Sequence, residues 1–393
     1  MDKQIFEQRR KLVLKPGKER VLVNRHPWIF AGAIARESGP SDAALADLID
    51  QNGGALASGF YSPHSQIRLR AMTFGGDELT AELLESRVSA AIARRRPILD
   101  HGTNAARLIN SEGDDLSAVV VDRYNDVLVV EIANYGVERI APLLIHALQR
   151  DLGPRLIYFK NDLPARRIEQ LTEEPRSIGD GNPSTTILEH GLRFEVEPAT
   201  GQKTGFFLDQ RENRLLARSL AAGRRVLNLF SYTGAFGVYA AAGGASSVEN
   251  VDVSAPAIDV ARRNHSLNGF EASFIVADAF EYVRKTTGRF DLLVCDPPAF
   301  ARTRSDIDRA ARGYKDVNLF AMKLVEPGGL MMTFSCSGHM SLDLFQKVIF
   351  AAALDAGRRV SFVRRLTAAA DHPVSIYCPE GEYLKGFLLQ VWD

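Results

Sequence analysis

The stretch Asn228-Leu229-Phe230-Ser231-Tyr232-Thr233-Gly234 closes an apolar run and leads into a helical pattern that starts near Ala235. From residue 223 onward this order of strand, turn and helix repeats, as in a doubly wound parallel sheet. The predicted strands cover residues 225–230, 247–251, 274–276, 290–295, 330–334, 361–364 and 385–391. The sequence therefore predicts an α/β fold class with a Rossmann-like, seven-stranded sheet.

The turn after the first strand is a candidate ligand site. Glycine lets the backbone pass close to a ligand, and the start of a helix offers free N–H groups. Its candidate cofactor-binding residues are Asn228, Phe230 and Gly234. The turn lacks the full Gly-x-Gly-x-x-Gly of pyrophosphate binders, which argues against NAD and leaves room for the amino-acid end of S-adenosylmethionine. By itself, the turn is weak evidence for any one cofactor.

Acidic residues follow the next two predicted strands. Asp252 can accept hydrogen bonds from both hydroxyls of a ribose. Asp278 can then meet the edge of an adenine, with Ala279 against the ring. Either carboxylate could instead cap the helix that follows it.

A further set of candidate cofactor-binding residues lies upstream, in residues 200–211. This segment mixes glycines, aromatic residues and opposite charges in a way that no regular element needs. We expect it to fold over the cofactor through Lys203, Phe206 and Asp209. A plain linker between domains is the alternative.

The motif Asp296-Pro297-Pro298-Ala299-Phe300 ends the fourth predicted strand. Two prolines fix the backbone and withhold N–H groups, so the turn projects rigidly. Asp296 can thus face the Watson–Crick edge of an extruded base beside Pro297 and Pro298, while Phe300 stacks on the ring. Asp296 is a candidate for cofactor binding as well. The motif indicates nucleobase methylation without selecting the atom.

Cys336 follows the fifth predicted strand, one strand over from Asp296. Carbon five of cytosine is a poor nucleophile until a thiolate adds to carbon six, so a reactive cysteine here would select cytosine. Buried cysteines are more often inert small hydrophobes, whereas the flanking Ser335 and Ser337 favour a polar, partly open loop. From the residues alone both interpretations stay open.

Basic and aromatic side chains coincide near the N-terminus, where charge can meet phosphates and a ring can stack on a base. The alternating apolar runs of this segment predict a small β-rich unit. A solvated β-module with a tryptophan in its core is the alternative, and the balance of 48 basic and 48 acidic residues gives no net attraction to nucleic acid. The candidate RNA-binding residues are Arg9, Arg10, Lys11, Arg25 and Trp28.

Cysteine usage and hydropathy indicate the cell compartment. Cys295, Cys336 and Cys378 lack the paired spacing of a zinc site or a disulfide framework, so we expect no metal and a reducing cytoplasm. The polar residues 1–4 lack the apolar core of a signal peptide, and no apolar run approaches the length of a membrane span. We therefore expect a cytoplasmic protein without a membrane partner.

Taken together, these motifs resemble the RlmI-type family of ribosomal RNA methyltransferases. The resemblance implies a PUA-like RNA-binding domain at residues 1–75, a small α+β middle domain at 76–200 and an S-adenosylmethionine-dependent methyltransferase domain at 201–393. It is compatible with a homodimer. The matching motifs are residues 25–30, 107–110, 121–124, 204–211, 228–234 and 296–300.

The family includes members that methylate cytosine at carbon five and others that act on guanine. The former carry a cysteine within a Ser-Cys-Ser strand end, so the resemblance implies that Cys336 is the nucleophile and that Asp296 contacts the base near N3. Ala299 stands where many other cytosine methyltransferases have a second cysteine, which leaves the acceptor of the carbon-five proton open.

We therefore expect an enzyme that uses S-adenosylmethionine to form 5-methylcytosine in 23S ribosomal RNA of the large subunit, through a covalent adduct of Cys336. One alternative is a guanine or exocyclic-amine methyltransferase in which Cys336 is structural. The other is a non-catalytic RNA-binding factor that uses a bound nucleoside only to hold its fold.

Overall fold

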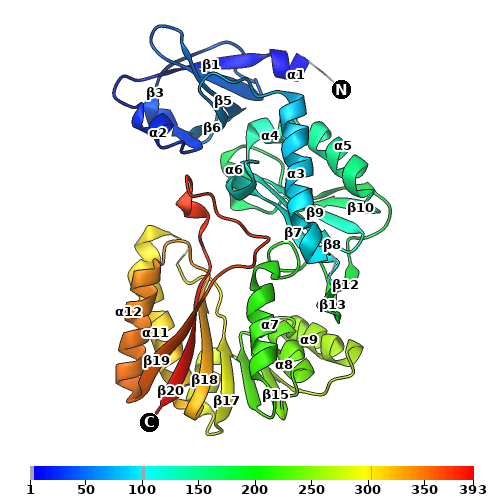
Figure 1. The fold of residues 1–393 in the computed structure, drawn as a ribbon, viewed down its shortest axis with the longest axis vertical. Coiled ribbons are helices and arrows are strands. Elements are labelled where there is room, and N and C mark those ends of the chain that lie inside the picture. The colour runs from blue at the N-terminus through cyan, green and yellow to red at the C-terminus, as the bar shows by residue number, and fades with distance from the viewer. Residues whose placement is uncertain (1–3, 100–101, 302) are drawn as a thin grey trace. The chain divides into compact units, whose positions relative to one another are not determined.

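The computed structural model describes residues 4–99, 102–301 and 303–393, so residues 1–3, used above for the localisation, lie outside it. The chain divides into two compact units (Figure 1). The first consists of Met1–Ile187, Val196–Phe206 and Asp371–Gly381, and the second of Leu188–Glu195, Phe207–Ala370 and Glu382–Asp393. The expected boundaries near residues 75 and 200 stay predictions.

The N-terminal part of the first unit is a six-stranded sheet in the order β2-β6-β5-β4-β1-β3, which confirms the β-rich expectation. Its core is a cluster of buried apolar side chains that includes Leu12, Ile29, Leu48 and Leu69. The helices here are short, α1 (Gln4–Glu7) and α2 (Arg20–Val23). The strands are β1 (Arg9–Leu14), β2 (Trp28–Phe30), β3 (Ile34–Ser38), β4 (Leu45–Ile49), β5 (Ala55–Tyr61) and β6 (Ile67–Phe74).

The first unit continues with a five-stranded sheet in the order β11-β10-β9-β8-β7. Helices α3 (Ala81–Leu99) and α5 (Ala141–Leu152) pack on each other and share one apolar core with this sheet. The strands are β7 (Ala105–Asn110), β8 (Val119–Tyr124), β9 (Val127–Ile132), β10 (Leu156–Phe159) and β11 (Arg176–Gly179). The short helices are α4 (Tyr135–Arg139) and α6 (Pro164–Ile168), and β12 (Thr185–Glu189) pairs with β13 (Leu192–Val196).

A segment from the far end of the chain completes the first unit. Residues Asp371–Gly381, here called the strap, follow β19 (Arg359–Leu366) and precede β20 (Lys385–Trp392). The carboxylate of Asp371 accepts a 2.8 Å hydrogen bond from the backbone N–H of Arg107, and its carbonyl accepts a 3.0 Å bond from buried Arg95. The strap is therefore held by residues more than 250 positions away in sequence.

The second unit is built on a seven-stranded sheet in the order β16-β15-β14-β17-β18-β20-β19. Neighbouring strands from β16 to β18 run parallel, while β20 is antiparallel to both β18 and β19. The remaining strands are β14 (Arg225–Leu229), β15 (Ser247–Asp252), β16 (Ser273–Val276), β17 (Phe290–Cys295) and β18 (Val325–Ser335). The predicted fold class and all of the predicted strands are confirmed.

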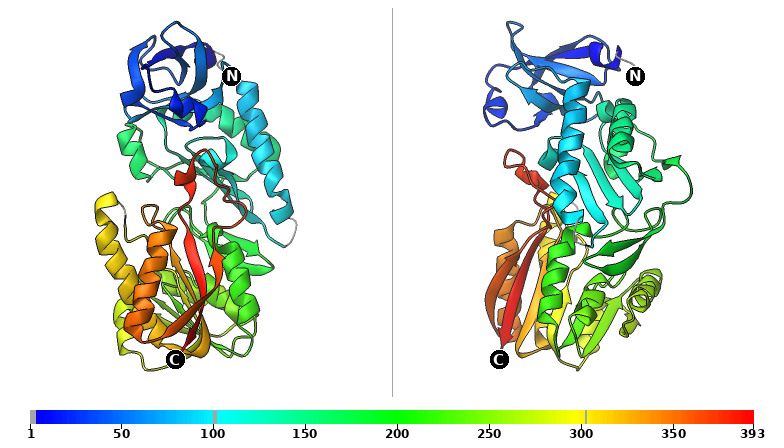
Figure 2. Two further views of the ribbon diagram at one scale, coloured as in Figure 1. Left: turned by 60° about the vertical axis from the view of Figure 1, so that its left-hand side comes forward. Right: turned by 45° about the vertical axis from the view of Figure 1, so that its right-hand side comes forward.

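Side chains alternate between two cores, because successive residues of a strand point to opposite faces. Leu227 and Leu293 pack under α10 (Ala279–Lys285), α11 (Ile307–Lys323) and α12 (Leu342–Ala356). Val226 and Leu292 pack under α7 (Arg211–Leu220) and α8 (Ala235–Ala242) on the other face. Helices thus cover both faces of the sheet (Figure 2). No helix in the described part of the chain is both long enough and apolar enough to cross a membrane.

Candidate active site

The strand order places a binding edge at the carboxyl end of β14. This strand lies between β15 and β17, and the chain connections lead away from it in opposite directions. In open α/β sheets, ligands bind at such a switch point, outside the carboxyl ends of the strands. The loops after β14, β15, β16 and β17 carry the predicted site residues to this edge.

The turn after β14 has an unusual backbone. Phe230, Tyr232 and Gly234 adopt positive φ angles of 56°, 47° and 76°. A Cβ on Gly234 would lie 2.8 Å from the Cβ of Ala261 in α9 (Ala255–Leu267), so both conformation and helix packing require glycine here. Asn228 is buried and donates a 3.0 Å hydrogen bond to the side chain of Asn250. The role of these residues toward a cofactor stays a prediction.

The two acidic residues at the ends of β15 and β16 bond to backbone N–H groups of the turns and helix starts near them. Asp252 accepts hydrogen bonds from the backbone N–H groups of Tyr232 (2.8 Å) and Ser254 (2.9 Å). Asp278 caps α10 through Oδ1, which accepts from the N–H groups of Phe280 (2.8 Å) and Glu281 (3.1 Å), and Ala279 is the first, buried residue of that helix. The capping alternative is therefore confirmed for Asp278, whereas the cap of α9 is Ser254 and not Asp252. Contacts of the two carboxylates to ribose and adenine stay predictions.

Asp296 is positioned by a pair of amide side chains. Its Oδ2 accepts a 3.0 Å hydrogen bond from Gln210, whose own carbonyl oxygen accepts a 2.6 Å bond from Asn213 of α7. Gln210 is buried in the 3-10 turn η3 (Leu208–Gln210). The sequence analysis missed this contact. Its signal was a glutamine and an asparagine three residues apart at the start of an amphipathic helix.

The loop residues expected to cover the cofactor fall in different units. Lys203 and Phe206 belong to the first unit, where the N–H and carbonyl of Phe206 both bond to the hydroxyl of Tyr124 at 3.2 Å. Asp209 belongs to the second unit, and its carboxylate accepts a 2.6 Å hydrogen bond from Tyr383. Their shared role in cofactor binding stays a prediction.

Cys336 lies beside the double-proline turn. Strands β17 and β18 pair in parallel with Cys295 opposite Thr333, which brings the two strand ends together. The half-buried thiol of Cys336 donates a weak hydrogen bond to the carbonyl of Pro297 over 3.7 Å. The structure thus places the predicted nucleophile next to the predicted base-binding motif.

The inference that the flanking serines mark an open loop was wrong. Ser335 and Ser337 are fully buried, and Ser337 Oγ lies 3.0 Å from the hydroxyl of Tyr314 and accepts from the N–H of Ala301 at 3.2 Å. Cys336 itself is the partly exposed residue of the three. Cys295 is fully buried, as expected, and burial raises the pKa of its thiol.

Aromatic rings line the double-proline turn. Phe300 packs against Tyr314 with ring centroids 4.5 Å apart and against Phe280 at 5.8 Å, and Phe280 in turn contacts Phe230 at 6.2 Å. Burial raises the pKa of Tyr314 to about 12, so its phenol is protonated at neutral pH. Pro297 is buried and Pro298 exposed.

Lys385 is a further residue that the sequence analysis missed. It pairs with Ser335 across β18 and β20, and its side chain is buried. Its ammonium donates to the carbonyls of Ser337 (3.2 Å) and Tyr383 (3.0 Å). Burial lowers the pKa of Lys385, while Glu382 and Cys336 raise it. A lysine in an otherwise apolar strand was the available signal.

Some of the candidate RNA-binding residues form ion pairs or hydrogen bonds within the protein, and others are exposed. Arg9 pairs with Asp47 at 3.0 Å and Arg10 with Glu37 at 2.9 Å. Half-buried Trp28 donates a 2.8 Å hydrogen bond to Glu112. Lys11 and Arg25 are exposed. Contact of any of these five side chains with RNA stays a prediction.

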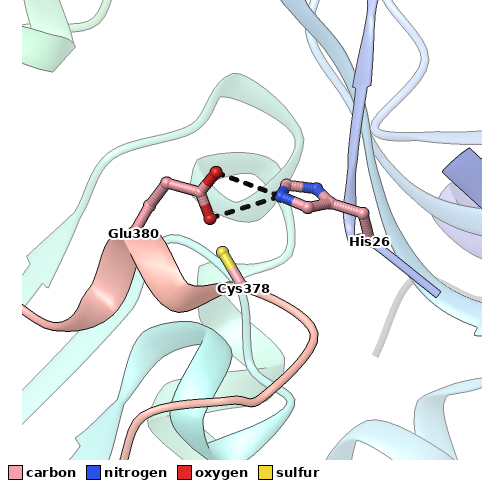
Figure 3. Close-up of side chains that lie close together, drawn as sticks. All are labelled: His26, Cys378 and Glu380. Atoms are coloured by element: carbon pink, nitrogen blue, oxygen red, sulfur yellow. Dashed lines mark hydrogen bonds and ion pairs between the residues drawn. The ribbon is translucent and has the colours of Figure 1, made fainter. Parts of the chain in front are cut away.

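His26, Cys378 and Glu380 meet in the first unit although they are far apart in sequence (Figure 3). Each offers one possible metal ligand, and these atoms lie within 4.8 Å of one another. Burial and the carboxylates of Glu112 and Glu380 raise the pKa of Cys378 to about 12, whereas a metal-binding thiol must be deprotonated. His26 Nε2 lies 3.3 Å from the carboxylate of Glu380, so we interpret the cluster as a polar contact that holds the strap.

Comparison with known proteins decides the family. A family model described as S-adenosylmethionine-dependent methyltransferase matches residues 147–378, and a PUA-like domain model matches residues 12–74. Ribosomal RNA large subunit methyltransferase I of Shewanella denitrificans is 43% identical over 97% of this chain and 99% of its own length. The chain belongs to this family. The corresponding protein of Tolumonas auensis is 44% identical over 96% of the chain and 98% of its own length.

Solved structures agree with this fold. A protein described as a methyltransferase complexed with SAH superposes with a TM-score of 0.82 over 97% of this chain and 99% of its own, at 22% identity. A methyltransferase from Streptococcus mutans gives a TM-score of 0.81 with the same coverage and identity. The family membership confirms the predicted PUA-like domain, the methyltransferase domain and the use of S-adenosylmethionine.

Proposed function

We propose that this methyltransferase acts on ribosomal RNA of the large subunit and forms 5-methylcytosine through a transient bond between Cys336 and the base. The name of its relatives supports the RNA substrate. The observation that carries the choice of cytosine is the half-buried thiol of Cys336, 3.7 Å from the carbonyl of Pro297 in the Asp-Pro-Pro motif.

The thiolate of Cys336 starts the reaction by adding its electron pair to carbon six of the cytosine. The electrons of the double bond between carbons five and six shift, and carbon five becomes nucleophilic enough to take a methyl group. After methylation a base takes the carbon-five proton, and the electrons of that bond re-form the double bond between carbons five and six. The bond between sulfur and carbon six then breaks, and its electron pair returns to sulfur. Cys336 is thereby regenerated as a thiolate.

Asp296 contacts the base near N3, where negative charge collects once the sulfur has added. A carboxyl group that donates its proton there stabilises this charge. The hydrogen bond from Gln210 holds the carboxyl in place before the substrate arrives. Phe300 would face the same base from the motif, and its packing on Tyr314 keeps the ring fixed.

The carboxyl edge of the sheet suits S-adenosylmethionine, which supplies a methyl group activated by its sulfonium. Asp252 ends β15 and bonds to the turn after β14, and Asp278 follows β16 at the same edge of the sheet. Carboxylates can accept hydrogen bonds from the ribose hydroxyls and the adenine amine of S-adenosylmethionine, and their negative charge suits its positively charged sulfonium. Asp252 would bind the ribose and Asp278 with Ala279 the adenine.

Asp252→Asn is expected to weaken the binding of S-adenosylhomocysteine about 10- to 100-fold, because hydrogen bonds to a charged group contribute about 1.5–3 kcal/mol. Isothermal titration calorimetry on the full chain measures the dissociation constant. Asp259→Asn is the matched control, because Asp259 is an exposed residue of α9 a few positions downstream. This variant should bind S-adenosylhomocysteine as the unaltered protein does. An unchanged constant for Asp252→Asn would remove Asp252 from the ribose site.

The position of the methyl group tests the proposed reaction. Ribosomal RNA from a strain that lacks the gene is incubated with the protein and S-adenosylmethionine carrying a labelled methyl group. We expect the label in 5-methylcytidine after digestion to nucleosides, and restoring the gene should restore the same nucleotide in cells. Label in a guanosine or on an exocyclic amine would favour the first alternative, and no label at all would favour a non-catalytic factor.

A homodimer also stays a prediction.

A further inference from the structure

We infer that the buried ammonium of Lys385 stabilises the thiolate of Cys336 and is thus a positioning residue for the nucleophile. A catalytic role for this interaction rests on the proposed function, in which Cys336 is the nucleophile. Its geometry does not depend on which base is methylated.

The backbone places Lys385 next to the cysteine. Ser335 and Lys385 are partners in the antiparallel ladder of β18 and β20, one residue before Cys336. The lysine Nζ donates to the carbonyl of Ser337, one residue after the cysteine, at 3.2 Å, and Cys336 acts electrostatically on the ammonium. The ammonium is therefore held on the peptide segment that carries the thiol.

The ammonium of Lys385 is buried, so a nearby negative charge would stabilise it. Lys385 is 6% exposed, and burying a positive charge is unfavourable unless it is paired. Two of its three protons go to the carbonyls of Ser337 and Tyr383. Within the part of the chain that the structure describes, no ion pair joins Lys385 to a carboxylate. Glu382 favours the charged ammonium, and a thiolate at Cys336 adds a second negative charge that favours it.

The other titratable groups around the thiol do not supply positive charge. Tyr314 approaches from α11 and is neutral at pH 7. Asp296 precedes the proline whose carbonyl the thiol contacts, and Glu382 precedes β20 and is exposed. Both are acidic, so of these groups only Lys385 favours a thiolate.

The proton balance is the same by either route. If Lys385 carries its proton, the thiol proton leaves to solvent and the ammonium stabilises the thiolate that remains. If burial has removed the proton from Lys385, the amine accepts the proton of the thiol directly. Both routes end in a thiolate beside an ammonium, with no further reactant required.

Alkylation of the full chain by iodoacetamide tests the inference without RNA or methyl transfer. The rate of modification of the peptide that contains Cys336 is followed by mass spectrometry between pH 5 and 10. We expect Lys385→Met to lower this rate about tenfold at pH 7 and to move the midpoint of the rate-against-pH curve upward, because the thiolate loses its partner charge. Cys295 and Cys378 are buried thiols with raised pKa values and serve as slow internal references.

Two variants separate charge from packing. Lys385→Arg keeps the positive charge and should retain a curve close to that of the unaltered protein. Lys347→Met removes an exposed lysine from α12 and should change nothing. If Lys385→Met does not fold, Lys385→Gln carries the same test.

The inference is overturned if the curve of the neutral variant matches that of the unaltered protein, or if Lys385→Arg moves it as far as Lys385→Met does. Failure of the proposed cytosine chemistry would leave the alkylation curves unaffected. The two ideas can therefore fail separately.

Discussion

Cys336→Ala is expected to lower methyl transfer at least about 1000-fold, because carbon five of cytosine cannot attack a methyl group until a sulfur has added to carbon six. The measurement is the transfer of label from S-adenosylmethionine to ribosomal RNA of a strain that lacks the gene. The loss should appear in turnover, and binding of S-adenosylhomocysteine should stay unchanged.

Cys378→Ala is the matched control, since this cysteine is buried in the first unit beside His26 and Glu380. It should retain turnover. RNA containing 5-fluorocytosine at the target should form a covalent conjugate with the unaltered protein, because fluorine cannot leave as the proton does, and none with Cys336→Ala. Full activity of Cys336→Ala would refute the cytosine proposal and make Cys336 structural.

Asp296→Ala is expected to lower turnover about 100- to 10,000-fold, the range found for a positioned acid or base. Without the carboxyl, the charge that collects near N3 after sulfur addition is not stabilised. Single-turnover measurement of methyl transfer at saturating S-adenosylmethionine checks this prediction.

Asp291→Asn offers a control on the same strand. Asp291 lies near the amino end of β17, where it pairs with Arg225 at 3.1 Å, far along the strand from the site. This variant should keep normal turnover although it loses a surface ion pair. If Asp296→Ala shows no larger loss than Asp291→Asn, Asp296 has no role in the chemical step.

The sheet of the second unit was predictable because its central strands, such as β17 and β18, contain apolar runs and end at turns. Residues 290–295 form β17 as predicted, and the two prolines after Asp296 mark its end. The same reasoning found Asp252, Asp278 and Cys336, since residues after parallel strands must gather at one edge of the sheet. Sequence order therefore fixed which residues lie near the site.

The contacts of those residues were less predictable. Ser335 and Ser337 look like loop residues, yet they are buried because Tyr314 and the N–H of Ala301 supply hydrogen-bond partners to Ser337 from distant segments. Lys385 lies opposite Ser335 through the register of two antiparallel strands, and a shift of that register by one residue would turn the lysine to the opposite face. Such register is set by packing across the whole sheet and is not visible in a local pattern.

The strap has a consequence for how the protein is made. The first unit includes residues Asp371–Gly381, which the ribosome adds after all the other residues of that unit. A nascent chain that stops before Asp371 lacks the acceptors of two hydrogen bonds, one from the backbone N–H of Arg107 and one from the side chain of Arg95, so the first unit stays incomplete until the strap has been synthesised. An amino-terminal fragment that ends anywhere before the strap would therefore never complete the first unit.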